Sequence, residues 1–300
     1  MKIGVVLPAA QGEGVDGMPG WPHVRAFALG AEERGLDSVW MYDHFYYRTD
    51  SGELEGQHEA WTIVSGVAAV TERVEIGTIV LCTSFRNPGL TAKMAATGDE
   101  VSDGRLILGL GAGWHDPEYD AFGYGRDHRA DRFEEALRVI APLLRGERVT
   151  FEGRYERAND AELAPAPKRP IPILIAGQRR RMLRLTARHA DAYNTAWYGA
   201  PDERLDQQLA ALDDALEADG RDPASMTRTV GVVARDPGRE PNGNNDGAND
   251  DREFAGSVDE LAKALDAHEA IGVDHLIVVL QPMDEASLDW LTKALDVRSG

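Results

Sequence analysis

The sequence predicts a single-domain α/β fold, a (β/α)8 TIM barrel that spans residues 1–300. Eight short apolar runs rich in β-branched residues alternate with helix-length amphipathic stretches from end to end of the 300-residue chain. Eight strand–helix units in about this length are typical of a barrel, whereas a doubly wound open sheet, the competing fold, seldom needs eight evenly spaced units. With 43% hydrophobic residues the chain can bury a large core.

The predicted strands are mostly near-continuous apolar runs, as expected for strands covered on both faces. The run 191–197, DAYNTAW, is the weakest of them. The predicted strands are residues 2–8, 37–44, 74–82, 105–113, 171–177, 191–197, 227–234 and 274–280. The helical stretches include residues 24–36, 60–74, 132–146, 181–190, 204–220 and 258–272, and several end at glycine, which favours a left-handed C-terminal cap.

Two insertions interrupt this alternation, one after the fourth strand–helix unit and one after the seventh strand. Residues 147–169 predict a small β excursion and a proline-rich connector, which we expect to form a lid over the barrel mouth. Residues 236–253 contain no large apolar side chain and are dense in Asn, Asp and Gly. Such a composition cannot repay the entropy of ordering, so we expect a mobile loop on the catalytic face.

Composition limits the classes of partner. A net charge of −19 disfavours nucleic acid and anionic membranes as partners of the surface as a whole. Cys82 is the only cysteine, which excludes a disulfide framework and a cysteine-based zinc site. The N-terminus is broken early by Pro8 and glycines, unlike a signal peptide, and no apolar run approaches the ~20 residues needed to span a bilayer. We therefore expect a soluble cytoplasmic protein.

The second predicted strand ends in an unusual pair, Asp43 and His44. In an α/β barrel the reactive groups collect at the carboxyl ends of the strands, so a strand-end histidine is a candidate for catalysis. Its imidazole titrates near working pH and can carry the proton that accompanies a hydride transfer. Asp43 would orient His44, bind a cofactor ring or cap the next turn; in the purely structural interpretation His44 bonds a loop carbonyl.

The fourth strand ends in GLGAGWHDPEY, with glycine at positions 109, 111 and 113. This spacing does not match the dinucleotide motif GxGxxG. Alternating glycines leave one strand face without side chains, which fits either a flat ring lying against the backbone or tight packing inside the barrel. Trp114, His115 and Tyr119 follow, and we expect them to rise into the barrel mouth.

The fifth strand ends in AGQRRR, which places Arg179, Arg180 and Arg181 in the first turn of the next helix. A helix N-terminus has free N–H groups and a positive dipole end, so it favours acidic residues. Three arginines there, in a protein this acidic, indicate a bound phosphate or phosphodiester more than a solvated basic face.

Two other classes of function remain open from the residues alone. His44, His115, Asp43 and Asp116 could gather at a metal, as in barrel hydrolases, although no HExxH or comparable spacing fixes a ligand set. A barrel that binds or stores a flavin-type ligand without chemistry is the other alternative.

Six segments of the chain resemble the bacterial luciferase-like monooxygenase superfamily, and specifically its branch that uses the deazaflavin coenzyme F420. They are residues 31–45, 58–93, 99–124, 171–178, 188–195 and 272–280, and they follow one another in the family's order. The resemblance implies an oxidoreductase that transfers a hydride between F420 and a small organic substrate. An FMN-dependent two-component monooxygenase of the same superfamily is the alternative. A homodimer is also implied.

The resemblance further implies roles for individual residues. His44 would face the reactive carbon of the ring as the proton donor or acceptor, with Asp43 beside it. A cis peptide that is not at proline, Ile79–Val80 by alignment, would support the ring. The rest of the implied cofactor site is Gly111, Ala112, Gly113, Trp114, Gly177, Gln178, Arg179, Arg180, Asn194 and Thr195. Phe45, His115 and Tyr119 would contact the substrate.

The chain departs from the family at two positions. Family members often carry a second glycine after Gly177, where this chain has Gln178. Members that oxidise sugar phosphates carry a glutamate where Trp114 stands, which argues against a sugar-phosphate dehydrogenase.

Overall fold

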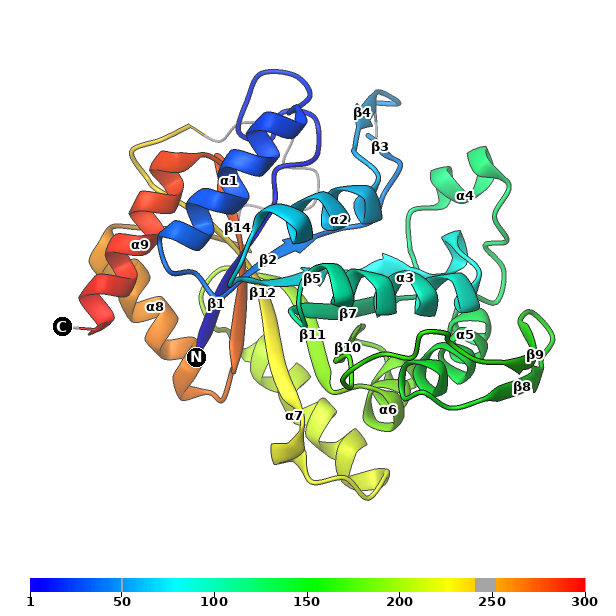
Figure 1. Ribbon diagram of the computed structural model, residues 1–300. Coiled ribbons are helices and arrows are strands. Elements are labelled where there is room, and N and C mark those ends of the chain that lie inside the picture. The colour runs from blue at the N-terminus through cyan, green and yellow to red at the C-terminus, as the bar shows by residue number, and fades with distance from the viewer. Residues whose placement is uncertain (50, 241–251, 300) are drawn as a thin grey trace.

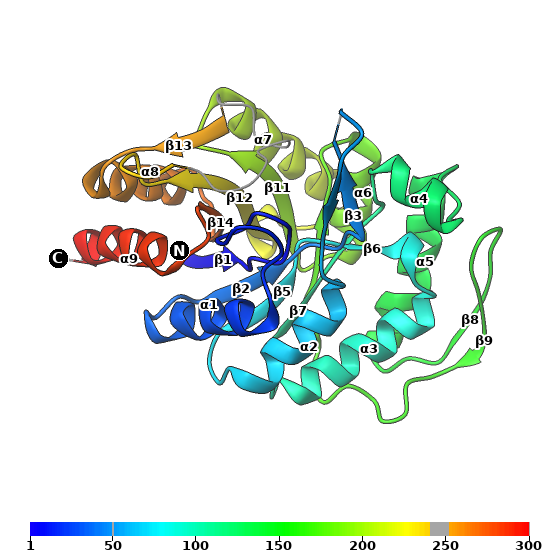
Figure 2. The ribbon, with the colours of Figure 1, turned by 90° about the horizontal axis from the view of Figure 1, so that it is seen from above.

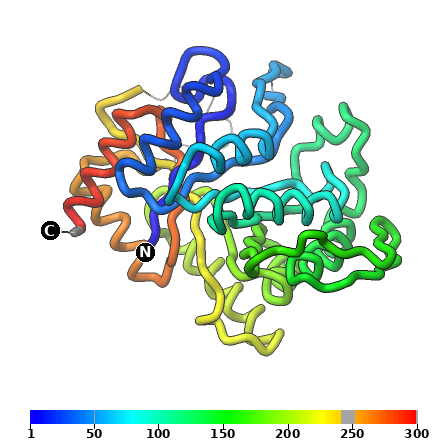
Figure 3. Tube along the Cα trace, in the orientation of Figure 1, coloured from blue at the N-terminus to red at the C-terminus, as the bar shows by residue number. Residues whose placement is uncertain are grey.

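The computed structural model describes residues 1–49, 51–240 and 252–299 and confirms the predicted barrel (Figure 1). Eight parallel strands form a closed ring in the order β10-β11-β12-β14-β1-β2-β5-β7, and β7 pairs with β10 to complete it. These strands are β1 (Lys2–Val6), β2 (Ser38–Met41), β5 (Glu75–Thr78), β7 (Leu106–Gly111), β10 (Ile173–Ala176), β11 (Ala192–Tyr198), β12 (Thr227–Arg235) and β14 (His275–Gln281). The first and last of them lie side by side (Figure 3).

The strands form where the apolar runs are, because these segments are buried on both faces. Every residue of β2 is buried, and its Trp40 packs edge-on against His275 of β14. The run with the weakest pattern, 191–197, also forms a barrel strand, because β11 pairs with a neighbour on each side.

The main helices lie outside the ring of strands (Figure 2). Their bounds are α1 (Trp21–Glu33), α2 (Ala60–Val70), α3 (Pro88–Val101), α4 (Asp116–Phe122), α5 (Arg129–Leu144), α6 (Arg180–His189), α7 (Glu203–Ala218), α8 (Val258–Ala270) and α9 (Glu285–Ser299). Side chains cap several of them, such as Asn87, which accepts bonds from two backbone N–H groups of α3. Short 3-10 turns occupy Thr83–Phe85 and Pro223–Ser225.

Several short strands lie outside the eight-stranded ring. β6 (Leu81–Cys82) extends the edge beside β7, and β13 (Glu253–Ala255) pairs with β12. β3 (Tyr46–Arg48) and β4 (Leu54–Gly56) form an antiparallel hairpin that follows β2 and projects from the barrel (Figure 1). This hairpin begins two residues after His44.

The insertion at 147–169 contains the expected β excursion, an antiparallel pair of β8 (Val149–Glu152) and β9 (Arg157–Ala161). Glu135 of α5 accepts three backbone N–H bonds from the turn between them, and Arg169 pairs with Asp99 of α3. The insertion therefore packs on outer helices. This placement differs from the expected lid, because none of residues 147–169 is among the described residues that line the pocket reported below.

Residues 241–251 of the loop expected to be mobile, 236–253, lie outside the described residues. Within the described ranges, no helix is long and apolar enough to cross a membrane.

Candidate active site

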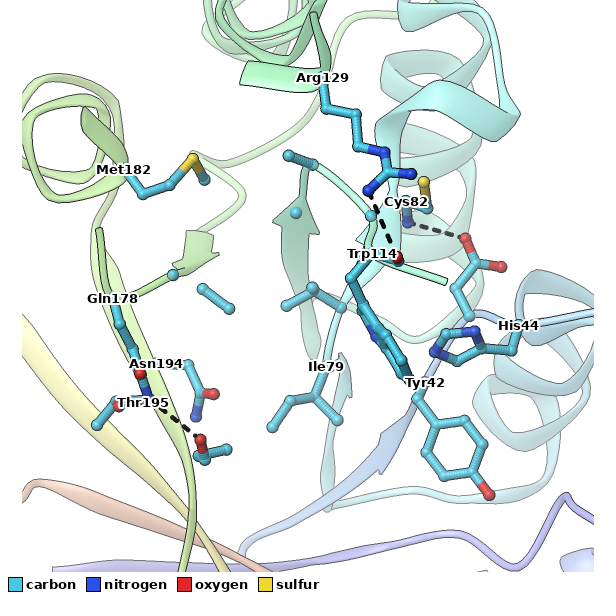
Figure 4. Close-up of a pocket in the computed structure, with 18 of the residues that line it drawn as sticks. Tyr42, His44, Ile79, Cys82, Trp114, Arg129, Gln178, Met182, Asn194 and Thr195 are labelled. Atoms are coloured by element: carbon cyan, nitrogen blue, oxygen red, sulfur yellow. Dashed lines mark hydrogen bonds between the residues drawn. The ribbon is translucent and has the colours of Figure 1, made fainter. Parts of the chain in front are cut away.

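A pocket of about 740 Å³ opens at the carboxyl ends of the barrel strands. Its walls come from the ends of β2, β5, β7, β10 and β11, as expected for an α/β barrel. Most residues predicted for the site lie together here: Asp43, His44, Ile79, Val80, Gly111, Ala112, Gly113, Trp114, Gly177, Gln178, Arg179, Asn194 and Thr195. Figure 4 shows His44 and Trp114 on one wall, Gln178, Asn194 and Thr195 on the opposite wall, and Ile79 between them.

His44 is held by a carboxylate that the sequence analysis did not single out. Its Nδ1 lies 2.8 Å from Oε2 of Glu118, on α4, and the side chain of Glu118 is 1% exposed. The other carboxylate oxygen, Oε1, accepts a bond from the Phe45 backbone N–H. The imidazole is therefore fixed at one nitrogen, and Nε2 is the ring nitrogen left for a ligand.

Asp43 lines the pocket, but its carboxylate is bonded to neighbouring protein groups. Arg86 donates to both of its oxygens, at 2.6 and 2.9 Å, and the Cys82 backbone N–H donates to Oδ2 at 2.9 Å. Arg86 also donates to Glu59. Burial acts to lower the pKa of Arg86, but the bonds to Asp43 and Glu59 outweigh it and raise that pKa. Of the three roles expected for Asp43, orienting His44 is not the one that this geometry supports.

One wall of the pocket is a backbone surface made by a bulge and by glycines. The Ile79–Val80 peptide bond is cis, which confirms the prediction made for that bond. A Cβ on Gly111 would lie 2.6 Å from Cγ2 of Val80, and a Cβ on Gly109 would lie 1.8 Å from the Thr78 carbonyl oxygen. Tight packing therefore requires both glycines, and Gly111 also leaves room for a ligand because it lines the pocket.

Phe45 and Tyr119 do not contact the pocket as predicted. Phe45 packs against Phe85 and Phe122, with ring centroids 4.8 and 4.6 Å apart. Tyr119 is fully buried, donates to the Ala112 carbonyl oxygen at 3.0 Å, and is not among the described residues that line the pocket. The physical reason is that both rings pack in a small aromatic cluster behind the wall, together with Cys82. That burial raises the pKa of the Cys82 thiol to about 11.

His115 is also placed behind the wall. It is 8% exposed, and its Nε2 accepts a bond from the Arg48 backbone N–H at 3.2 Å. Burial lowers its pKa. His115 therefore ties the β3–β4 hairpin to the start of α4, which differs from the predicted contact with substrate. Trp114, in contrast, is 63% exposed, and its ring meets His44 edge-on at the pocket.

The three arginines at the start of α6, residues 179–181, lie in three different environments. Arg179, the N-cap residue, lines the pocket, whereas Arg180 is exposed and is not among the described lining residues. The difference follows from the backbone, because Arg179 is still extended (φ −79°, ψ 147°) whereas Arg180 is the first residue of the helix. Arg181 forms ion pairs with Asp131 and Glu134 of α5. Of the predicted pair Arg179 and Arg180, only Arg179 is in a position to meet a ligand in the pocket.

The wall opposite His44 is polar and adjoins the N-terminus of α6. The Gln178 amide donates to Thr195 Oγ1 at 3.1 Å, and the Asn194 amide donates to Thr229 Oγ1 at 2.8 Å. Gly177 has φ of +151°, and a Cβ there would lie 2.8 Å from Met182 Cβ. Within the described part of the chain, no side chain caps the N-terminus of α6, and Arg179 and Met182 at this end of the helix line the pocket.

Three residues that bear on this pocket were not predicted from the sequence: Glu118, Arg86 and Trp197. Glu118 looks in the sequence like an acid placed in a first helical turn to match the helix dipole, and only its burial shows otherwise. Arg86 lies four residues after the end of the third predicted strand, and a cation close to a strand end was the available signal. Trp197 ends the weakest predicted strand.

The described residues do not support the metal alternative. In the ranges that the structure describes, no group of three or more His, Cys, Asp or Glu side chains could hold a metal ion. Asp43 forms an ion pair with Arg86, and Asp116 forms ion pairs with Arg126 and Arg129.

Comparison with known proteins identifies the family. The family model of luciferase-like monooxygenases matches residues 1–236. An F420-dependent glucose-6-phosphate dehydrogenase of Kineococcus radiotolerans is 37% identical over 211 residues, which are 69% of this chain and 61% of that protein. The chain thus spans less than two thirds of this relative. Pyrimidine monooxygenase RutA of Klebsiella pneumoniae is 30% identical over 324 aligned positions, which cover 100% of this chain and 78% of that protein.

Solved structures agree on the fold. An F420-dependent secondary alcohol dehydrogenase in complex with an F420–acetone adduct superposes with a TM-score of 0.81 at 20% identity, over 99% of this chain and 98% of that one. EDTA monooxygenase from Chelativorans superposes with a TM-score of 0.81 at 15% identity, over 99% and 94%. At these identities the likeness concerns the barrel alone. The matched family model over most of the chain shows that this protein belongs to the luciferase-like monooxygenase family.

Proposed function

We propose that this protein is a coenzyme F420-dependent oxidoreductase that transfers a hydride between the deazaflavin and a small organic substrate. The observation that carries the proposal is His44, an imidazole fixed at one nitrogen by Glu118, on the wall of a pocket large enough for a cofactor ring. The similarity to F420-dependent relatives over 69% of the chain supports the choice of cofactor.

The residues of the pocket fit a flat ring with an anionic tail. The backbone wall of Ile79, Val80 and Gly111 is apolar and lacks a Cβ at the glycine, which leaves room for a ring. Gln178 and Arg179, beside the uncapped start of α6, would hold the tail phosphate through N–H donors and positive charge. When bound, a deazaflavin supplies a ring carbon that accepts or donates a hydride and does not readily activate oxygen.

His44 would handle the proton that accompanies this hydride. In the oxidative direction, the substrate hydroxyl gives its proton to Nε2 of His44, and the Glu118 carboxylate stabilises the imidazolium that forms. In the reverse direction the same nitrogen returns the proton. Trp114 and Trp197 line the pocket, and we propose that they limit the access of water to it.

The test is His44→Ala, with His128→Ala as the matched control. His128 is a half-exposed histidine that pairs with Asp131, and it is not among the described lining residues. Removing a general acid–base should lower kcat about 10²–10⁴-fold while F420 binding persists, and the control should keep wild-type turnover. Wild-type turnover in His44→Ala would refute the assigned role.

An FMN-dependent two-component monooxygenase is the second candidate. It is favoured by the Klebsiella pneumoniae pyrimidine monooxygenase, whose similarity covers the whole of this chain. Fluorescence titration of the purified protein with F420 and, separately, with FMN distinguishes the two. Binding of F420 alone supports the first proposal; binding of FMN alone, with reductase-dependent oxygen uptake, replaces it with the second.

We also propose that the protein forms a homodimer, as the family resemblance implies. Sedimentation velocity of the purified protein checks this, with a single monomeric species as the contrary result.

A further inference from the structure

We propose that Glu118 is a positioning residue that fixes the tautomer of His44, with the proton on Nδ1, so that Nε2 meets the pocket as the proton acceptor. This inference rests on the proposed function for its catalytic consequence. Its structural part, the tautomer, can be measured in the protein without any cofactor.

Glu118 contacts the His44 ring through one carboxylate oxygen and backbone N–H groups through the other. Oε2 lies 2.8 Å from Nδ1 of His44, and Oε1 accepts the Phe45 backbone N–H, with the Tyr46 backbone N–H at 3.5 Å. A backbone N–H can only donate, so Oε1 is necessarily an acceptor. Two N–H groups at one oxygen favour a negatively charged carboxylate, and a carboxylate at Oε2 requires a proton on Nδ1.

Burial restricts the ways in which His44 and Glu118 can bond. The side chains of Glu118 and His44 are 1% and 11% exposed, so water does not compete freely for the bond between them. The imidazole is also confined by neighbouring rings, with its centroid 4.5 Å from Tyr47 and 5.5 Å from Trp114. Asp43, the sequence neighbour of His44, is committed to Arg86 and is not the group that holds the imidazole.

The alternative arrangement is a protonated Glu118 that donates from Oε2 to an unprotonated Nδ1. His44 would then carry its proton on Nε2 and could not accept one there. The two arrangements have the same heavy-atom positions, so the location of the hydrogen decides between them.

Glutamine at position 118 should invert the tautomer. The Phe45 N–H needs an acceptor, so the amide oxygen of Glu118→Gln faces it and the amide NH2 faces His44 Nδ1. Nδ1 must then accept, which moves the neutral-ring proton to Nε2. The variant also removes the negative charge that stabilises the imidazolium.

The first experiment is 15N NMR of histidine-labelled protein without cofactor, with the His44 signal identified by its loss in His44→Gln. We expect the neutral wild-type ring to carry its proton on Nδ1 and the Glu118→Gln ring to carry it on Nε2. A wild-type ring with the proton on Nε2 overturns the proposal, even if the variant fails to fold.

Glu32→Gln is the matched control. Glu32 is a buried carboxylate that accepts backbone N–H bonds from residues 72–74, and it is not among the described residues that line the pocket. Its replacement changes the same functional group and should leave the tautomer of His44 unchanged. An equal shift in the control would show a general loss of structure and overturn the assignment to Glu118.

The second experiment is turnover with F420. Glu118→Gln should lose about 10²–10⁴-fold in kcat, as removal of a carboxylate behind a catalytic histidine does elsewhere, while the Kd for F420 changes less than about threefold. Wild-type turnover in Glu118→Gln overturns the proposal, whereas failure of wild-type protein to bind F420 overturns the proposed function and leaves the tautomer result standing.

Discussion

Replacing His275 with glutamine should make the stability of this protein less sensitive to acid. His275 is 3% exposed on β14, and its Nε2 lies 2.7 Å from the Ser38 hydroxyl. That hydroxyl already accepts the Trp40 indole N–H, so it has its own proton to donate to a neutral imidazole. Burial, with smaller effects from Lys2 and the N-terminal amine, lowers the pKa of His275 from 6.5 to about 3.

The direction and size of the effect follow from linkage. Because the folded-state pKa lies below the unfolded one, the unfolded chain binds more protons between pH 6.5 and about 3. The stability contribution of neutral His275 is therefore complete above pH 6.5 and is lost progressively as the pH falls toward 3. At about 1.4 kcal/mol per pH unit, the free energy of unfolding should drop by about 2 kcal/mol between pH 8 and pH 5, and by about 5 kcal/mol at the limit.

Urea denaturation followed by circular dichroism at pH 8, 7, 6 and 5 measures this loss. The glutamine in His275→Gln keeps a polar group near Ser38 but cannot titrate. The difference in free energy of unfolding between wild type and variant should therefore narrow by about 2 kcal/mol from pH 8 to pH 5. The other histidines are present in both proteins and cancel in the comparison. A difference in free energy of unfolding that stays constant from pH 8 to pH 5 would refute the reasoning.

Three further predictions concern the pocket. Arg179→Ala should weaken F420 binding about 10- to 100-fold with a marked salt dependence, whereas Arg180→Ala should change the Kd less than about twofold; equal effects would contradict the assignment of the anion site. Gly111→Val should lower cofactor affinity at least about tenfold in the same titration, since even a Cβ there would lie 2.6 Å from Val80 Cγ2; unchanged affinity would place the ring elsewhere. Arg86→Met should lower the free energy of unfolding by about 3–5 kcal/mol in urea, because it leaves a buried carboxylate unpaired; a loss under about 1 kcal/mol would show that this carboxylate finds another partner.

The predicted strands agree well with the barrel because strand burial is a local property of this sequence. Runs such as 105–113 and 274–280 are apolar enough to be covered on both faces, and each became a barrel strand. The lid was expected from the β excursion and proline-rich connector at residues 147–169 and from their place after the fourth unit. The structure instead places residues 149–161 against α5, through bonds between Glu135 and the turn that no sequence pattern reveals.

The site was predictable where a residue's role follows from its position at a strand end. His44, Gly111 and Gly177 reach the pocket because the barrel brings every strand end to one face. Phe45 and Tyr119 were misplaced because an aromatic side chain near a strand end can turn either toward a pocket or into packing, and the choice depends on neighbours such as Phe85.

The sequence by itself therefore determined the barrel, the face that carries the pocket and the histidine at its wall. Only the tertiary structure decided which acidic side chain bonds to which partner. Asp43 is adjacent to His44 in sequence but binds Arg86, whereas Glu118, 74 residues away, holds the imidazole. The reason is geometric, because adjacent residues at the end of a strand point in different directions, and buried charges are matched by the loops that meet over the barrel mouth.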